Sequence, residues 1–334
     1  MSNKRYPHLM FSEKIVSLHS KARSFDIMQN KAEYRTSLVS KSLPIAKRLS
    51  AIYSFPIAKT IRCVSLCDLQ VYKDFFAWMG KPELFKMRKN RILEYADIAP
   101  LAYLHIALEG GTKNYVKHLL VDEMQDYSPI QYKVMQKLFP CRKTVLGDTS
   151  QSVNPYGSST ADMIQRALVT GEVMKLCKSY RSTYEITDFA QKIRTNTDLE
   201  PVARHGKKPQ ILQFNNEKEE LSAIKKLIVT HQASAYKSLG IVCKTESQAY
   251  EMAEKLQIPD IHFLSNQSSA FVQGIVITSA HMAKGLEFNE VIIPQVDDKN
   301  YHSEIDRSML YVAATRAMHR LTLTYSGTKH TPFI

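Results

Sequence analysis

The chain has 334 residues, of which 44% are hydrophobic and 23% are charged, close to the proportions of an ordinary globular protein. This length suggests two or three domains. No run of about 18 or more apolar residues is present, which argues against a transmembrane helix. The basic start, MSNKR, is not followed by the apolar stretch and small-residue cleavage site of a secreted protein.

The balance of charge favours a polyanionic partner. Lys and Arg number 45 against 32 Asp and Glu, which leaves a formal charge of +13 and an isoelectric point near 9.3. Neutralising the phosphates of a nucleic acid releases counterions, so a basic surplus of this size supports nucleic-acid binding. Charge alone leaves a generally basic surface open as the alternative.

Cysteine usage points to a reducing compartment. The five cysteines are Cys63, Cys67, Cys141, Cys177 and Cys243, an odd number without a regular framework. Cys63 and Cys67 are four residues apart and could share a helix face, but no further pair of zinc ligands lies nearby. We therefore predict free thiols and a cytoplasmic location.

The first 110 residues predict a mainly helical, basic region. Short apolar groups alternate with Lys and Arg up to about residue 56, and Pro44 and Pro56 interrupt the pattern. Residues 61–108 continue as mainly helical, with one helix expected to start at Asp97, which would cap it ahead of an early proline. The pair Gly110 and Gly111 then breaks the chain.

Beyond residue 111 the pattern changes to strands that alternate with helices. Predicted strands lie at 118–121, 143–147, 210–214, 238–243, 274–278, 291–294 and 321–325. Predicted helices start near residue 129 and occupy 217–231, 246–256 and 304–318. Such alternation indicates an α/β fold with parallel strands between helical layers.

The strongest local signal is an acidic string, DEMQD at residues 122–126, directly after an apolar strand. Asp122 and Glu123 would lie at the carboxyl end of that strand, where open α/β sheets bind ligands. Asp122 is placed to hold Mg²⁺, because hard cations prefer oxygen ligands. Glu123 is placed to polarise a water that attacks a γ-phosphate. An acidic pair after a strand is more often a solvated turn, but the extended string is much rarer.

The acidic string resembles motif II of UvrD/Rep-type superfamily 1 helicases, and four further blocks follow in that family's order. They are LGDTSQSV at 146–153, SYRS at 179–182, SAHMAKGLEF at 279–288 and LYVAATRA at 310–317, similar to motifs III, IV, V and VI. The short spacing between the blocks and the helix at 97–108 look most like the HelD branch, whose members act on RNA polymerase. The resemblance covers residues 118–318.

The resemblance implies roles in ATP and Mg²⁺ chemistry for one set of residues. Gln151 would sense the γ-phosphate, while Arg181 and Arg316 would point at it with guanidinium groups that keep their charge and bind phosphate oxygens in a fork. Gly285 would allow close backbone approach to the nucleotide. Tyr180 would stack on adenine, and Glu287 would bind the ribose. Taken singly, these residues read as surface salt bridges or packing.

A second set of residues is implied in contacts with single-stranded DNA. Ser279, His281 and Lys284 lie where the family contacts the strand, and Tyr156 stands where it often stacks an aromatic ring on a base. Residues 154–157 lack the aromatic and arginine that usually accompany that ring. This departure weakens the expectation of strong strand binding.

One element of the family is missing from the sequence. A complete motor needs a phosphate-binding loop, Gly-x-x-x-x-Gly-Lys-Ser/Thr, ahead of motif II. Gly80 and Lys81 are followed by proline, and Gly110 and Gly111 lack the required spacing. The adenine-reading Gln motif is not recognisable either. We therefore predict that this chain alone is inactive, although its family consists of ATP-dependent DNA helicases.

The resulting reading is an incomplete RecA-like motor. Residues 1–110 would form a helical insertion, 111–168 the rest of the first lobe, and 169–334 the second lobe. The parent activity would be ATP-driven movement on single-stranded DNA, or remodelling of RNA polymerase, with the missing amino-terminal motor segment as a further partner. The alternative is a non-catalytic module that binds nucleic acid or RNA polymerase without hydrolysis.

Overall fold

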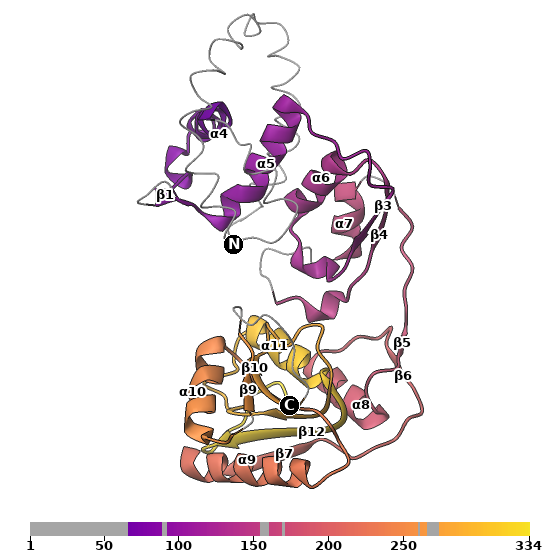
Figure 1. The fold of residues 1–334 in the computed structure, drawn as a ribbon, viewed down its shortest axis with the longest axis vertical. Helices are drawn as coiled ribbons and strands as arrows, with labels where there is room; N and C mark the ends of the chain where they lie inside the picture. The colour runs from indigo at the N-terminus through magenta and orange to yellow at the C-terminus, as the bar shows by residue number, and fades with distance from the viewer. Residues whose placement is uncertain (1–65, 89–91, 154–159, 169–170, 260, 266–273) are drawn as a thin grey trace, which may run out of the picture. The chain divides into compact units, whose positions relative to one another are not determined.

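A computed structural model describes residues 66–88, 92–153, 160–168, 171–259, 261–265 and 274–334 (Figure 1). The predictions for residues 1–56, Cys63 and Tyr156 lie outside the described residues. The chain divides into two compact units. Unit 1 comprises Met1–Gly147 and Tyr156–Glu172, and unit 2 comprises Asp148–Pro155 and Val173–Ile334. The predicted division at residues 110 and 168 stays a prediction.

The helical part of unit 1 consists of α4 (Leu66–Trp78) and α5 (Tyr95–Glu109), joined by the short turn η1 (Pro82–Leu84) and the hairpin β1 (Met87–Arg88) and β2 (Ile92–Leu93). The two long helices contact each other and share one apolar cluster. The described part of residues 61–108 is mainly helical, as predicted, although a short hairpin lies between the two long helices.

Asp97 does not cap α5, so that prediction is wrong. The helix begins two residues earlier, at Tyr95, with Glu94 in the capping position. Asp97 lies buried inside the first turn, where its carboxylate accepts a hydrogen bond of 2.9 Å from the hydroxyl of Tyr72. Burial outweighs that hydrogen bond and raises the pKa of Asp97. The Asp97 carboxylate therefore links α5 to α4 through its hydrogen bond with Tyr72. As predicted, the helix ends at the glycine pair, with Gly110 in a positive-φ conformation.

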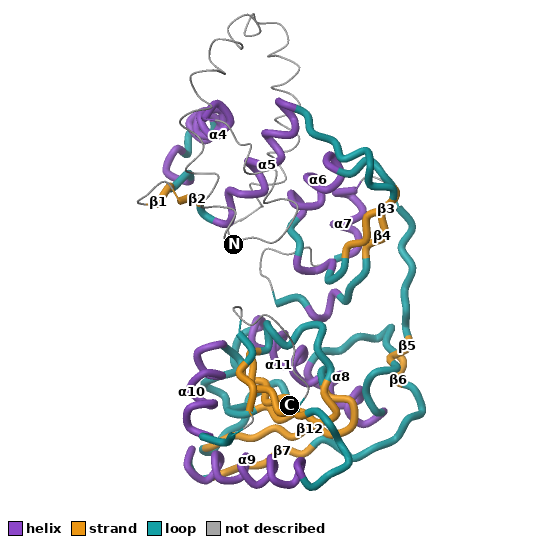
Figure 2. The backbone as a smooth tube through the Cα atoms, in the orientation of Figure 1, coloured by secondary structure: helices purple, strands orange, loops and turns teal. Residues whose placement is uncertain are grey.

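The remainder of unit 1 is a parallel strand pair with helices against it (Figure 2). In chain order the elements are β3 (His118–Val121), η2 (Met124–Asp126), α6 (Pro129–Leu138), β4 (Arg142–Val145) and α7 (Ala161–Leu168). β3 and β4 pair in parallel, with His118 opposite Arg142. The predicted strands at 118–121 and 143–147 and the helix from Pro129 are confirmed, the second strand within two residues at either end.

Unit 2 is built on a six-stranded parallel sheet in the order β7-β12-β11-β8-β10-β9. Its strands are β7 (Gln210–Phe214), β8 (Leu239–Cys243), β9 (Ile261–Phe263), β10 (Ile275–Ser279), β11 (Phe288–Ile293) and β12 (Ala317–Ser326). β8 and β10 are buried along their whole length. Parallel strands covered on both faces require such continuous apolar runs.

Helices supply the two apolar layers of unit 2. One cluster joins the sheet to α8 (Tyr184–Ile193) and α11 (Glu304–Ala314), and the other joins it to α9 (Glu217–Gln232) and α10 (Glu246–Leu256). A small parallel pair, β5 (Lys178–Ser179) and β6 (Glu200–Pro201), and the turn η3 (Thr149–Gln151) complete the unit. The predicted α/β class, with parallel sheets flanked by helices, is confirmed.

The predicted helix at 304–318 is four residues too long. α11 ends at Ala314, and the chain turns through Thr315 and Arg316 into β12. Ala317 pairs with Phe288 of β11. The residues from Ala317 onward therefore form a strand, although their sequence pattern continues that of the helix. Tertiary strand pairing overrides local helix preference here.

Candidate nucleotide and nucleic-acid sites

The acidic pair lies in a tight loop at the carboxyl end of β3, as predicted. Glu123 has a left-handed backbone, with φ 51° and ψ 50°, which is uncommon for a residue with a side chain. Its N–H donates to Asp122 Oδ1 at 2.8 Å, and its carboxylate accepts a 2.6 Å hydrogen bond from Gln125 Nε2. Gln125 is fully buried, so it holds the Glu123 carboxylate in one orientation.

Three contacts fix this loop against the rest of unit 1. The Met124 N–H donates to Leu146 O at 2.9 Å, and the Tyr132 hydroxyl donates to Met124 O at 2.7 Å. Burial, with the nearby Tyr127 and Asp126, raises the pKa of Tyr132 and keeps its hydroxyl protonated as a donor. Gly147 lies so close that a Cβ there would be 2.6 Å from Met124 N. The left-handed conformation is therefore held by its surroundings.

The donor chemistry of this loop suits a hard divalent cation. Asp122 is exposed and Glu123 is half-buried, so both carboxylates are accessible. Among the residues that the structure describes, no group of three or more His, Cys, Asp or Glu could hold a metal by itself. Two accessible carboxylates fit Mg²⁺, which keeps several waters and uses one or two carboxylates together with phosphate oxygens. Cys141, Cys177 and Cys243 are free thiols.

Replacing Gly147 by alanine should displace the acidic loop. The new Cβ would lie 2.5 Å from Gln125 Oε1 and 2.6 Å from Met124 N, and the latter is backbone that cannot rotate away. We expect unit 1 to lose about 1–3 kcal/mol of unfolding free energy, measured by urea denaturation through the fluorescence of Trp78, the single tryptophan.

The matched control is Gly327→Ala. Gly327 also has positive φ, at 104°, but a Cβ there would meet nothing within 4 Å. It lies in unit 2, so Trp78 fluorescence should report no change in unit 1, and the overall cost should be limited to about 1–2 kcal/mol of backbone strain. An unchanged unfolding midpoint of unit 1 in Gly147→Ala would contradict the close packing described here.

In unit 2, Arg316 lies at the centre of a buried hydrogen-bond network and is 1% exposed. Its guanidinium donates to Gln151 Oε1 at 2.5 Å, to Leu286 O at 3.4 Å and to Val312 O at 3.1 Å. The Gln151 amide in turn donates to Asp148 Oδ2 at 3.0 Å. The structure thus brings together Gln151, which the resemblance assigns to sensing the γ-phosphate, and Arg316, which it assigns to pointing at that phosphate.

A second arginine of unit 2 is paired with a carboxylate. Arg181 Nε lies 2.5 Å from Glu287 Oε1, and both side chains are partly exposed. Arg204 donates to the carbonyl oxygen of Arg181. Gly285, two residues before Glu287, has φ 75° and open space where a Cβ would be. Tyr180 is 70% exposed, as a ring available for stacking would be.

The remaining predicted residues lie at the opposite edge of the sheet. Ser279 ends β10 beside Cys243, the last residue of β8, whereas β11 meets β8 through Glu290 and Leu239, the first residue of β8. His281 is exposed and Lys284 is half-buried, just after the end of β10. Residues 280–287 therefore lead from the carboxyl edge, with Ser279, to the amino edge, where Glu287 and Arg316 lie.

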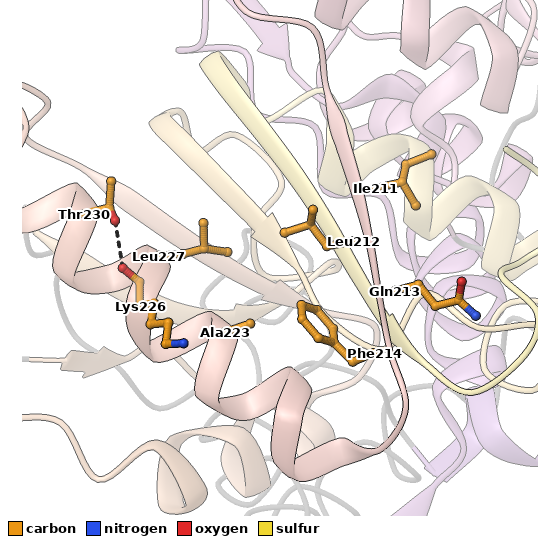
Figure 3. Close-up of a pocket in the computed structure, with 8 residues that line it drawn as sticks. All are labelled: Ile211, Leu212, Gln213, Phe214, Ala223, Lys226, Leu227 and Thr230. Carbon is orange, nitrogen blue, oxygen red and sulfur yellow. Dashed lines mark hydrogen bonds between the residues drawn. The ribbon is translucent and has the colours of Figure 1, made fainter.

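Several residues with positioning contacts carried no assigned role in the sequence. Gln125 lies within the acidic string, so its signal was present without a function attached. The only sequence signal for Tyr132 is its place in a predicted helix, and the only one for Gly147 is its place in the block similar to motif III. An open cavity of about 420 Å³ between β7 and α9 contains none of the predicted residues (Figure 3). Its lining is largely apolar and unsuited to phosphate.

Together these features define the class of protein as a parallel α/β chain of RecA-like type, with an acidic strand-end loop in one unit and buried and paired arginines in the other. UvrD/REP helicase N-terminal domain matches residues 80–169, and UvrD-like helicase C-terminal domain matches residues 174–272 and 261–328. The chain is therefore similar, over most of its described length, to helicases of the UvrD/Rep superfamily.

Curated relatives are consistent with this assignment. The chain is 26% identical over 181 residues to ATP-dependent DNA helicase Rep of Escherichia coli, covering 49% of this chain and 27% of that protein. It is 24% identical over 304 residues to a putative ATP-dependent DNA helicase of Acanthamoeba polyphaga mimivirus, covering 77% and 42%. It is 29% identical over 167 residues to ATP-dependent DNA helicase PcrA of Staphylococcus epidermidis, covering 45% and 22%. The chain thus spans less than half the length of these relatives.

Among solved structures, the C-terminal domain of a possible DNA helicase from Lactobacillus plantarum is similar at 27% identity, with a TM-score of 0.40. The similarity covers 46% of this chain and 91% of that one. Within the part of the chain that the structure describes, no helix is long and apolar enough to cross a bilayer.

Proposed function

We propose that this chain is part of an ATP-dependent motor that acts on single-stranded DNA. The observation that carries the proposal is the acidic loop, in which Glu123 is held in a left-handed conformation while Gln125 orients its carboxylate. Structural surroundings maintain such a costly conformation at functional sites more often than elsewhere. Similarity to the two domains of UvrD-like helicases supports the reaction class.

The roles of the residues follow from their chemistry. Asp122 would hold Mg²⁺, which would supply positive charge beside the phosphates, and Glu123 would orient the attacking water and accept a proton from it. Arg316 and Arg181 stabilise negative charge on the phosphates. Tyr180 offers a stacking surface for adenine, and Gly285 leaves room beside the nucleotide for close backbone approach. Glu287, which pairs with Arg181 in the structure, would accept a hydrogen bond from the ribose.

Nucleic-acid contacts in unit 2 belong to the other edge of its sheet. Ser279, His281 and Lys284 supply a hydroxyl, an imidazole and an ammonium, all groups that bind phosphate oxygens. A cytoplasmic location, a HelD-like subgroup and action on RNA polymerase remain finer proposals. They are supported by the cysteine usage and by the short spacing between motifs.

ATP hydrolysis by the purified chain tests the proposal. With Mg²⁺ and oligo(dT), we expect no turnover by this chain alone, because no Gly-x-x-x-x-Gly-Lys-Ser/Thr is present in its sequence. Joined to the amino-terminal motor segment of a relative such as Rep, the chain should hydrolyse ATP in a DNA-stimulated manner. Glu123→Gln should abolish that turnover, since an amide cannot accept the proton from water.

A matched variant separates chemistry from folding. Glu109→Gln changes an exposed carboxylate at the end of α5 and should leave turnover unchanged. Turnover by the unmodified chain that Glu123→Gln abolishes would show that another segment replaces the phosphate loop. Turnover in the joined protein that survives Glu123→Gln would contradict the role of this residue.

A non-catalytic binding module is the second candidate. It is favoured by the missing phosphate loop together with the formal charge of +13. In that case the chain would bind nucleic acid or RNA polymerase with an affinity that ATP and Glu123→Gln both leave unchanged.

A further inference from the structure

The amino ends of β3 and β4 form a basic edge that the proposed function does not use. Lys117 precedes β3, His118 opens it, and Arg142 opens β4 directly opposite His118. All three side chains are exposed. They line an open cavity of about 640 Å³, a size that small-ligand sites in proteins commonly have.

Charge in this part of unit 1 is sorted along the strands. Between residues 110 and 147 the only carboxylates are Asp122, Glu123 and Asp126, all in the loop at the carboxyl end of β3. The opposite end carries Lys117 and Arg142, and residues 110–121 contain no acidic residue. A segment with several cations and no carboxylates of its own attracts a polyanion, whereas the usual solvated segment mixes both signs.

An exposed aromatic ring adjoins the cations. Tyr115 is 77% exposed, and the residues on either side of it, Asn114 and Val116, line the cavity. Lys113, two residues earlier, is also exposed. Cations that follow a phosphate backbone beside an aromatic ring that stacks on a base are the combination that single-strand binders use.

We propose that this basic edge of unit 1 binds single-stranded nucleic acid. Lys117 and Arg142 contact consecutive phosphates, and Tyr115 stacks on a base. This surface is separate from Ser279, His281 and Lys284, which belong to unit 2. The inference rests on the proposed function only in taking a single strand as the substrate, and it requires neither ATP binding nor hydrolysis.

Fluorescence anisotropy of labelled oligo(dT) with the full chain tests this surface across a range of salt concentrations. Each lost phosphate contact should reduce the slope of log affinity against log salt by about 0.7. The double variant Lys117→Gln/Arg142→Gln should therefore lose about 1.4 of that slope and bind about 10- to 30-fold more weakly at about 0.1 M salt. Tyr115→Ala should weaken oligo(dT) binding about fivefold or more, but not the binding of a blunt duplex, whose bases are not free to stack.

Two control variants separate this surface from general charge and from folding. Lys207→Gln/Lys208→Gln removes two exposed cations from unit 2 and should change oligo(dT) affinity less than twofold. Lys117→Arg/Arg142→Lys retains both charges and should bind as the original chain does.

Either of two results would overturn the proposal. One is an equal loss of affinity in Lys117→Gln/Arg142→Gln and in the unit 2 control, which would place binding elsewhere or make it nonspecific. The other is an equal effect of Tyr115→Ala on single strands and duplexes. Both results are independent of the hydrolysis assay. The proposed binding surface can therefore be disproved while the proposed ATPase function is supported, or supported while that function is disproved.

Discussion

Replacing Phe288 by alanine should destabilise unit 2 by about 3–5 kcal/mol. Phe288 is fully buried at the start of β11, and its ring packs against Gly240 of β8, where a Cβ would lie 2.5 Å from Cδ2. Alanine would leave a cavity at the centre of the sheet. The Phe288 N–H also donates to Arg316 O at 3.0 Å, so the cavity would loosen the strand that positions Arg316. Urea denaturation gives the free energy, and hydrogen exchange of the β8 amides reports unit 2 alone.

Graded variants distinguish packing from a general effect of losing a ring. Phe288→Leu should cost no more than about 1.5 kcal/mol, because it nearly conserves apolar volume. Phe214→Ala, on the half-buried edge strand β7, should cost clearly less than Phe288→Ala. Wild-type exchange of the β8 amides in Phe288→Ala would show that the close packing of Phe288 on Gly240 does not stabilise the sheet.

Replacing Arg316 by alanine should lower the unfolding free energy of unit 2 by about 2–4 kcal/mol, apart from any effect on catalysis. Hydrogen bonds made by a charged group contribute about 1.5–3 kcal/mol each, and buried acceptors left without a donor incur a desolvation cost. Arg316 is itself 1% exposed and donates to Gln151, Leu286 and Val312. Hydrogen exchange of the amides of α11 and β12 should report the loss.

Two variants frame this result. Gln151→Ala removes one of these acceptors and should cost about 1 kcal/mol. Lys192→Ala removes an exposed cation, whose Nζ lies 3.8 Å from Asp188, and should stay within about 0.5 kcal/mol of the wild-type value. A neutral effect of Arg316→Ala would mean that the buried guanidinium is held for catalysis at no benefit to stability.

The periodic segments of the fold could be predicted from the sequence because their patterns and their tertiary roles agree. The apolar run at 238–243 predicts the strand β8, and the predicted helix at 246–256 has the same bounds as α10. The wrong predictions arose where the local sequence pattern and the tertiary contacts favour different structures. Residues 315–318 continue a helical pattern, yet pairing with β11 makes them turn and strand. Asp97 is of a residue type that often caps helices, but here it is buried and accepts a hydrogen bond from Tyr72.

The candidate residues were chosen from sequence motifs, but how their side chains are arranged could not be predicted. Gln151 and Arg316 are 165 residues apart, and no local pattern indicates that their side chains form a hydrogen bond. The ion pair of Arg181 and Glu287 is likewise a product of tertiary packing. The need for glycine at position 147 could not be predicted, because it depends on the backbone of Met124, which follows a different strand. The roles assigned to these residues remain predictions for the experiments above.

The sorted charges along β3 and β4 give this part of unit 1 a permanent electric dipole parallel to its strands. In the field of a polyanion such a dipole experiences a torque that turns its positive end towards the phosphates and its negative end away. Electrostatic repulsion would thereby keep Asp122 and Glu123 pointing away from the backbone of an approaching strand. Added salt would shorten the range of this orienting effect to about 8 Å at physiological ionic strength.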